Sequence, residues 1–66
     1  MFNLSEFRAA VARCGMTKKE VAEALGISEV TLWRKLNRNG DFTREEINIL
    51  IDRLKIEDIT AVFFAR

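Results

Sequence analysis

The segment TKKEVAEALGISEVTLWRKLN, from Thr17 to Asn37, is the most informative about the fold. Thr17 and Ser28 are residues that favour the N-cap of a helix, because their hydroxyls accept a hydrogen bond from a backbone N–H of the first turn. Gly26 lies where a helix ends easily, since glycine adopts the left-handed conformation with little strain. The pattern therefore predicts helices over about 18–25 and 29–38, joined by a sharp turn at Gly26-Ile27-Ser28.

The same start signal recurs elsewhere in the chain. In a capping box, the cap residue and a Glu three residues later bond each other's backbone N–H groups through their side chains. The chain contains three such pairs, which are Asn3 with Glu6, Thr17 with Glu20, and Thr43 with Glu46. With Gly15 and the turn Asn39-Gly40-Asp41 as stop signals, they predict further helices over about 4–14 and 44–54. A short fifth helix is expected near 57–63.

Apolar residues repeat at the three- and four-residue spacing of amphipathic helices. The residues that we expect in the core are Leu4, Phe7, Ala10, Val11, Cys14, Val21, Ala22, Leu25, Ile47, Leu50, Ile51 and Leu54. The sequence shows no alternation of the kind that indicates strands. We therefore predict an all-α fold, a compact bundle of four to five short helices in a single domain spanning residues 1–66.

The composition argues against several classes of protein. The chain has no His and one cysteine, Cys14, at a predicted core position. We therefore expect no disulfide, no metal site, no cofactor and no enzyme. The N-terminal MFNLSEF lacks the pattern of a signal peptide, and no apolar run approaches the roughly 20 residues of a membrane span. These features predict a cytoplasmic protein without a membrane partner.

The charges are distributed unevenly along the chain, although the net charge is only +1. Residues 1–40 contain seven Lys or Arg and four Glu, whereas residues 41–66 contain four Lys or Arg and six Asp or Glu. Net charge alone does not indicate a nucleic-acid partner. A basic first part, with several cations clustered on one predicted helix, permits one.

Two short helices joined by a tight turn are the anatomy of a helix-turn-helix, whose second helix can lie in the major groove of DNA. The sequence resembles the repressor and Cro family of phage and bacterial regulators. The positions that match the family pattern are Thr17, Val21, Ala22, Leu25, Gly26, Ile27, Ser28, Thr31 and Leu32. The segment from Arg34 to Ile47 and the ending VFFA are similar to small phage-type members of that family.

Lys18 departs from the family pattern, which often has Gln at this position. In the family, that Gln touches a DNA phosphate and orients a side chain of the recognition helix. A lysine can still meet a phosphate as a point charge, but it cannot accept a hydrogen bond. The resemblance implies a transcriptional regulator, repressor- or Cro-like, that occupies an operator on double-stranded DNA. Because family members commonly bind two-fold symmetric operators, it also implies a homodimer.

The helix predicted over 29–38 would present one face to DNA. Its two leucines, four residues apart, must face the core, so the opposite side faces outward. Arg34 can donate two bonds to guanine, and Glu29 can accept one from cytosine. Val30 and Thr31 can pack on a thymine methyl group. The predicted base-reading residues are Glu29, Val30, Thr31, Trp33 and Arg34, and the predicted contacts to the DNA backbone are Lys18, Ser28, Lys35, Asn37, Arg38 and Arg44.

Several of these residues also have a purely structural interpretation. A basic cluster on a surface helix is commonly a solvated face. Glu29 can stabilise the helix through its interaction with the helix dipole, because it lies in the first turn. Trp33 can fold over the following loop beside Phe42, and Asn37 can shape the turn at Asn39.

Phe63 and Phe64 are adjacent near the end of the chain. Neighbouring residues on a helix point about 100° apart, so both rings cannot fully enter one small core. Either one ring packs inward and the other is half covered, or the pair forms a dimer patch. A second function hypothesis uses such a patch, and the low net charge also favours it. The chain would then be a phage modulator or antirepressor that keeps the fold and binds another repressor protein.

Overall fold

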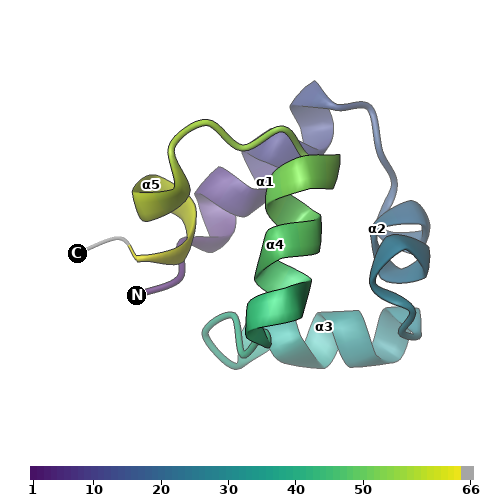
Figure 1. Ribbon diagram of the computed structural model, residues 1–66. Helices are drawn as coiled ribbons and strands as arrows, with labels where there is room; N and C mark the ends of the chain where they lie inside the picture. The colour runs from purple at the N-terminus through teal and green to yellow at the C-terminus, as the bar shows by residue number, and fades with distance from the viewer. Residues whose placement is uncertain (65–66) are drawn as a thin grey trace.

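The computed structural model describes residues 1–64, and these form five helices (Figure 1). The helices are α1 (Leu4–Arg13), α2 (Lys18–Leu25), α3 (Glu29–Asn37), α4 (Arg44–Arg53) and α5 (Ile59–Phe63). No strand occurs among the described residues. The predicted all-α bundle is therefore confirmed. Ala65, the last residue of the family-like ending VFFA, and Arg66 lie outside the described residues.

In Figure 1, α3 lies along one edge of the molecule, and α2 and α4 stand on it. α2 packs against both α3 and α4, and α1 packs against α5. The N-terminus lies on the side of α5, away from α2 (Figure 1). One face of α3 is consequently covered by the rest of the bundle, while no other helix of residues 1–64 lies over the edge-facing side of α3 (Figure 1).

Three of the predicted helix starts have the expected capping bonds. Thr17 and Glu20 form a reciprocal capping box, with bonds of 2.9 and 3.1 Å. Thr43 and Glu46 form a second box, with bonds of 2.8 and 3.2 Å. Ser28 caps α3 by accepting a 3.1 Å bond from the backbone N–H of Thr31. The sequence pattern therefore predicted these starts correctly.

The remaining two starts differ from the prediction in detail. Asn3 accepts a 3.1 Å bond from the N–H of Glu6, but the box is not reciprocal, because the N–H of Asn3 donates instead to the carbonyl of Val62 at 2.7 Å. The fifth helix begins at Ile59 rather than near 57. Its cap is Asp58, whose carboxylate accepts a 3.0 Å bond from the N–H of Ala61.

The turn between α2 and α3 is built as the sequence predicted. Gly26 has φ of +69°, in the left-handed region. Its N–H donates to the carbonyl of Glu23, and the N–H of Ile27 donates to that of Ala22, both at 3.0 Å. These bonds end α2 and change the direction of the chain within three residues. α3 therefore starts directly after the turn, at an angle to α2 (Figure 1).

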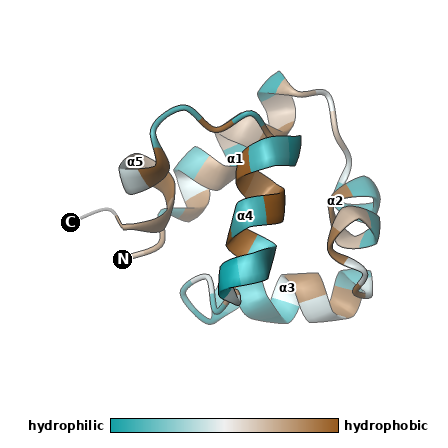
Figure 2. Cartoon of the chain, viewed as in Figure 1, coloured by the Kyte–Doolittle hydropathy of each residue, from teal (hydrophilic) through white to brown (hydrophobic). Residues whose placement is uncertain are grey.

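The core collects apolar residues from all five helices and from the segment between α4 and α5. Figure 2 shows hydrophobic and hydrophilic residues alternating around α1 and α4, as amphipathic helices require. The buried residues are Phe7, Ala10, Val21, Ala22, Leu32, Leu36, Leu50, Leu54, Ile56, Val62 and Phe63. The other expected core residues pack against them but are only partly buried, and they are Leu4, Val11, Cys14, Leu25, Ile47 and Ile51.

The thiol of Cys14 has a structural partner. Its Sγ donates a hydrogen bond to the carbonyl oxygen of Leu54, at 3.0 Å. The residue is partly buried rather than fully enclosed. The bond joins the end of α1 to the end of α4, so Cys14 serves the packing of two helices.

The two phenylalanines near the end of the chain have opposite environments. Phe63 is only 6% exposed and belongs to the core, whereas Phe64 is 57% exposed. The predicted dimer patch of both rings is therefore wrong for Phe63, which cannot meet a partner without leaving the core. Phe64 is the ring that an outside partner could contact.

Candidate nucleic-acid interface

The outward face of α3 carries large exposed side chains in the middle of the helix. Leu32 and Leu36 point inward and are 1% and 8% exposed. Val30 and Trp33, on the other side, are 65% and 62% exposed. Arg34 and Asn37 continue the same side and are also exposed. A helix that presents this row without a covering element has the geometry that a major groove admits.

The first turn of α3 is organised around its cap. Besides accepting from the backbone, the hydroxyl of Ser28 donates to Oγ1 of Thr31 at 3.0 Å. Thr31 is partly covered, while Glu29 is exposed. The hydroxyl hydrogen of Ser28 is therefore already used inside the protein, and Ser28 is a weaker candidate for a phosphate than the sequence predicted.

The last turn of α3 is closed by Asn37. Its Nδ2 donates to the backbone carbonyl of Trp33 at 2.8 Å, along the same helix. This bond supports the structural interpretation, in which Asn37 shapes the end of the helix. Arg38, the C-cap residue, is exposed beside it.

Lys35 holds α3 to α4 instead of pointing outward. Its Nζ lies 3.1 Å from Oε1 of Glu46 and donates to the backbone carbonyl of Asp41 at 3.2 Å. The same Nζ lies 6.0 Å from the ring centre of Phe42, within the range of a cation–π contact. The predicted role of Lys35 at the DNA backbone is therefore not supported, because three groups of the protein surround its charge.

Lys35 also occupies the position that one interpretation gave to Trp33. Phe42 is covered by the ammonium of Lys35 and by the rings of Phe2 and Phe7, at 5.9 and 6.4 Å between ring centres. Trp33 stays exposed on the outer side of α3. The alternative in which Trp33 folds over the loop beside Phe42 is therefore wrong.

Four other predicted cations remain available to a ligand. Arg34, Arg38, Lys18 and Arg44 are exposed, and none has an ion-pair partner among residues 1–64. Lys18 is the first residue of α2, and Arg44 is the first residue of α4. The N-terminus of a helix presents free backbone N–H groups and a partial positive charge, which suits a phosphate. The available cations thus lie along α3 and at two helix starts.

A comparison with protein families identifies the motif. Residues 7–38, from within α1 to the C-cap of α3, match the family model described as "Bacterial regulatory protein, Fis family". The chain is a helix-turn-helix DNA-binding regulator. The match does not single out the repressor and Cro type that the sequence resembles. No curated protein and no solved structure matches the chain in the corresponding searches.

The described residues show no sign of two other kinds of site. None of the helices in residues 1–64 has the length and apolar character to cross a membrane. Within the same part of the chain, no three or more His, Cys, Asp or Glu residues gather where they could hold a metal ion.

Glu46 is the residue near this interface whose importance sequence reasoning missed. It was predicted only as part of a capping box, yet it also pairs with Lys35 from another helix. Burial raises the pKa of Glu46, but the hydrogen bond from the Thr43 backbone and the bond and charge of Lys35 outweigh burial and lower it. No local spacing marks the pair, because the two residues are eleven positions apart and lie on different helices.

Glu46→Gln should make the free energy of unfolding less dependent on pH. Gln can still cap α4, so the change removes mainly the charge opposite Lys35. Because the folded-state pKa is lowered from 4.5, the stabilisation is complete above that value and is lost as pH falls through the folded pKa. We expect a loss of about 0.5–1 kcal/mol at pH 7, and this loss should shrink as the pH falls through the folded-state pKa of Glu46. Urea unfolding across this pH range measures it.

The matched control is Glu45→Gln, in the same turn of α4 but exposed and without an ion-pair partner among the described residues. It should leave the pH dependence of unfolding nearly unchanged. Equal effects of both substitutions would mean that the Lys35–Glu46 pair adds nothing specific.

Proposed function

We propose that this chain represses transcription in the manner of repressor and Cro proteins, by occupying an operator that overlaps a promoter. The observation that carries the proposal is the uncovered face of α3, with Arg34 exposed and unpaired among the described residues. A bidentate guanidinium on a groove-sized helix is the commonest means of reading guanine. The protein would act by binding rather than by catalysis, in the cytoplasm of a bacterium or a phage-infected host cell.

The roles of the base-reading residues follow from where they lie on α3. Arg34 would read a guanine, and Glu29, in the first turn, would read a cytosine. Val30 and Trp33 are exposed apolar side chains, which favours contact with thymine methyl groups or with the edge of the groove. Thr31 would contribute its methyl group beside them.

The phosphate contacts would come from fewer residues than the sequence suggested. Lys18 and Arg44 would hold phosphates at the starts of α2 and α4, and Arg38 would hold one at the end of α3. Lys35 is excluded from this set, since Glu46 and Asp41 already bind its ammonium. Ser28 and Asn37 would act mainly by fixing the two ends of α3.

Selection of bound sequences from a random duplex pool tests this proposal. The expected result is a single enriched motif, and affinity for it should fall steeply with salt because each neutralised phosphate releases counterions. If the protein bound all sequences equally well, the proposal that it regulates by occupying a specific operator would be wrong. A control variant, Lys19→Gln, changes an exposed lysine outside the proposed interface and should enrich the same motif.

A second candidate function is a modulator that binds another repressor protein. The exposed apolar residues of α3, together with Phe64, favour it, because such side chains also suit a protein partner. The two functions differ in their response to salt. A modulator should bind random duplex weakly at every salt concentration and should instead form a stable complex with a repressor.

Homodimer formation would depend on Phe64. We expect Phe64→Ala to turn a dimer into a monomer without loss of helix content, because the ring is exposed and contributes little to the core. Sedimentation at micromolar concentration, with and without a two-fold symmetric operator, measures this. Wild-type protein that is monomeric under both conditions would exclude the dimer, and Phe63→Ala should unfold the chain rather than dissociate it.

A further inference from the structure

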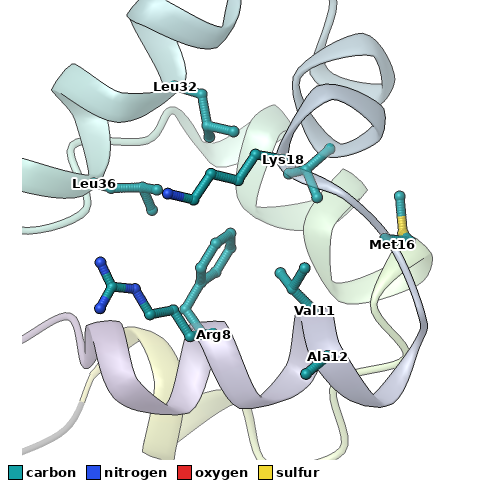
Figure 3. A pocket seen from close by; sticks show the side chains of 9 residues that line it. Arg8, Val11, Ala12, Met16, Lys18, Leu32 and Leu36 are labelled. Carbon is teal, nitrogen blue, oxygen red and sulfur yellow. The ribbon is translucent and has the colours of Figure 1, made fainter.

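An apolar cavity lies between α1, α3 and the start of α2. Its volume is about 200 Å³. Val11 of α1 lines it from one side, and Leu32 and Leu36 of α3 line it from the other (Figure 3). Phe7 of α1 also lines the cavity. α1 packs on α5 and α3 packs on α2, and the cavity lies where α1 faces α3.

Two cations stand at the same side of this cavity. In Figure 3 the side chains of Arg8 and Lys18 extend towards the side where Leu36 lies, and Val11 and Met16 lie towards the opposite side. Neither the Arg8 nor the Lys18 side chain has an ion-pair or hydrogen-bond partner within residues 1–64. Of the described residues that line the cavity, none is acidic. The site therefore combines an apolar floor with an unbalanced positive charge.

We propose that this cavity binds a small amphipathic carboxylate, with its apolar body inside and its carboxylate between Arg8 and Lys18. The volume favours a small molecule, because a cavity of about 150 Å³ accepts benzene and drug-sized ligands need at least about 300 Å³. A partner helix would need a longer groove for its row of side chains. The charge favours an anion, which would meet two cations and no carboxylate.

Binding of such a ligand opposes DNA binding, and this part rests on the proposed function. Lys18 is the residue that would hold a DNA phosphate at the start of α2. A carboxylate beside its ammonium competes for the same charge. In addition, Leu32 and Leu36, which line the cavity, belong to α3, the helix that would read the bases. By thermodynamic reciprocity, bound DNA lowers the affinity for the ligand by the same factor as bound ligand lowers the affinity for DNA.

The first test uses hexanoate, hexanol and hexylammonium, which share one apolar chain and differ in the charge of the head group. NMR titration without DNA should show hexanoate shifting the methyl signals of Val11, Leu32 and Leu36, with at least fivefold higher affinity than hexanol. Hexylammonium should bind most weakly. Equal affinities for the three probes, or no shifts at these methyl groups, would overturn the proposal.

Variants identify the residues responsible. Arg8→Gln and Lys18→Gln should each lower the affinity for hexanoate several-fold and leave the affinity for hexanol unchanged. Lys19→Gln, outside the cavity, should change neither affinity. Ala12→Leu, at an exposed lining position, should reduce binding of both probes. Thermal melts check that each variant is folded. Methyl shifts that follow protein concentration alone would place a second copy in the cavity and would overturn the proposal.

The second test measures DNA affinity in sodium hexanoate and in sodium acetate at equal ionic strength. Acetate carries the same charge without the chain, so only hexanoate should weaken DNA binding, by several-fold, and Lys18→Gln should abolish the difference. Hexanoate that binds in the cavity without changing DNA affinity would overturn the linkage. A protein that binds hexanoate but no duplex would instead contradict the proposed function and leave the ligand site standing.

Discussion

Gly40→Ala should be the most damaging substitution of a glycine in this chain. Gly40 has φ of +69°, and a Cβ there would overlap the ring of Phe2 and lie 2.6 Å from its Cβ. The left-handed conformation costs an alanine about 1–2 kcal/mol, and overpacking typically adds about 1–3 kcal/mol. We expect a loss of about 2–5 kcal/mol in the free energy of unfolding, which urea or thermal unfolding measures.

Gly26→Ala provides the matched control. Gly26 has the same φ of +69°, but a Cβ there would meet no atom within 4 Å. Gly26→Ala should lower the free energy of unfolding only by the cost of the left-handed conformation, about 1–2 kcal/mol. In a double-mutant cycle, Phe2→Ala should cost less stability in the Gly40→Ala background than alone, because it removes the overlap with the ring and leaves only the close contact between the two Cβ atoms. Equal costs for the two glycines would mean that Phe2 does not pack over the loop.

The packing of Phe2 explains why this loop matters for the fold. Its ring lies 5.7 Å from Phe7, 5.9 Å from Phe42 and 6.0 Å from Phe63, measured between ring centres. Phe2 thus joins the start of α1, the loop between α3 and α4, and α5. A shift of this ring would loosen three segments at once.

Leu50→Ala should have the second large effect on stability. Leu50 is 1% exposed, in the middle of α4. Truncation of a buried leucine typically costs about 2–5 kcal/mol, through lost burial and the cavity that it leaves. A domain of this size has only about 5 kcal/mol in total, so the variant should be largely unfolded near 37 °C. Circular dichroism during a thermal melt measures this.

Leu25→Ala is the matched control, because the chemical change is the same but Leu25 is only partly buried against the core. It should lower the melting temperature less than Leu50→Ala does. If both variants had the same melting temperature, the different burial of Leu25 and Leu50 in the structure would not determine how much each contributes to stability.

Local signals in the sequence were sufficient for the helices and for the turn. Thr17, Ser28 and Thr43 are caps whose bonds form between residues three apart, so a short window contains all the information. The end of α4 shows the limit of such signals. There Lys55 adopts φ of +51°, a conformation usually taken by glycine, and its identity gave no indication of it.

The candidate site was predictable only in part. Arg34 was expected on the outer face of α3 because helical periodicity places it opposite the buried leucines. The role of Lys35 was not, because its partners Glu46 and Asp41 come from α4 and the preceding loop. Arg8 had no predicted role, since only the packing of the bundle brings it beside Lys18 at one cavity. Interactions between distant segments are what the sequence pattern does not contain.

The central claim is that α3 reads DNA bases through Arg34 while Lys18 holds a phosphate. The most direct measurement is the affinity of wild type, Arg34→Ala and Lys18→Ala for the selected operator and its single-base variants at several salt concentrations. Arg34→Ala should lose about 1–3 kcal/mol of discrimination at one base pair of each half-site. Lys18→Ala should keep the preferred sequence and lower the salt slope by about one unit. If Arg34→Ala distinguishes every operator variant as the wild type does, Arg34 reads no base and the account of this interface is wrong.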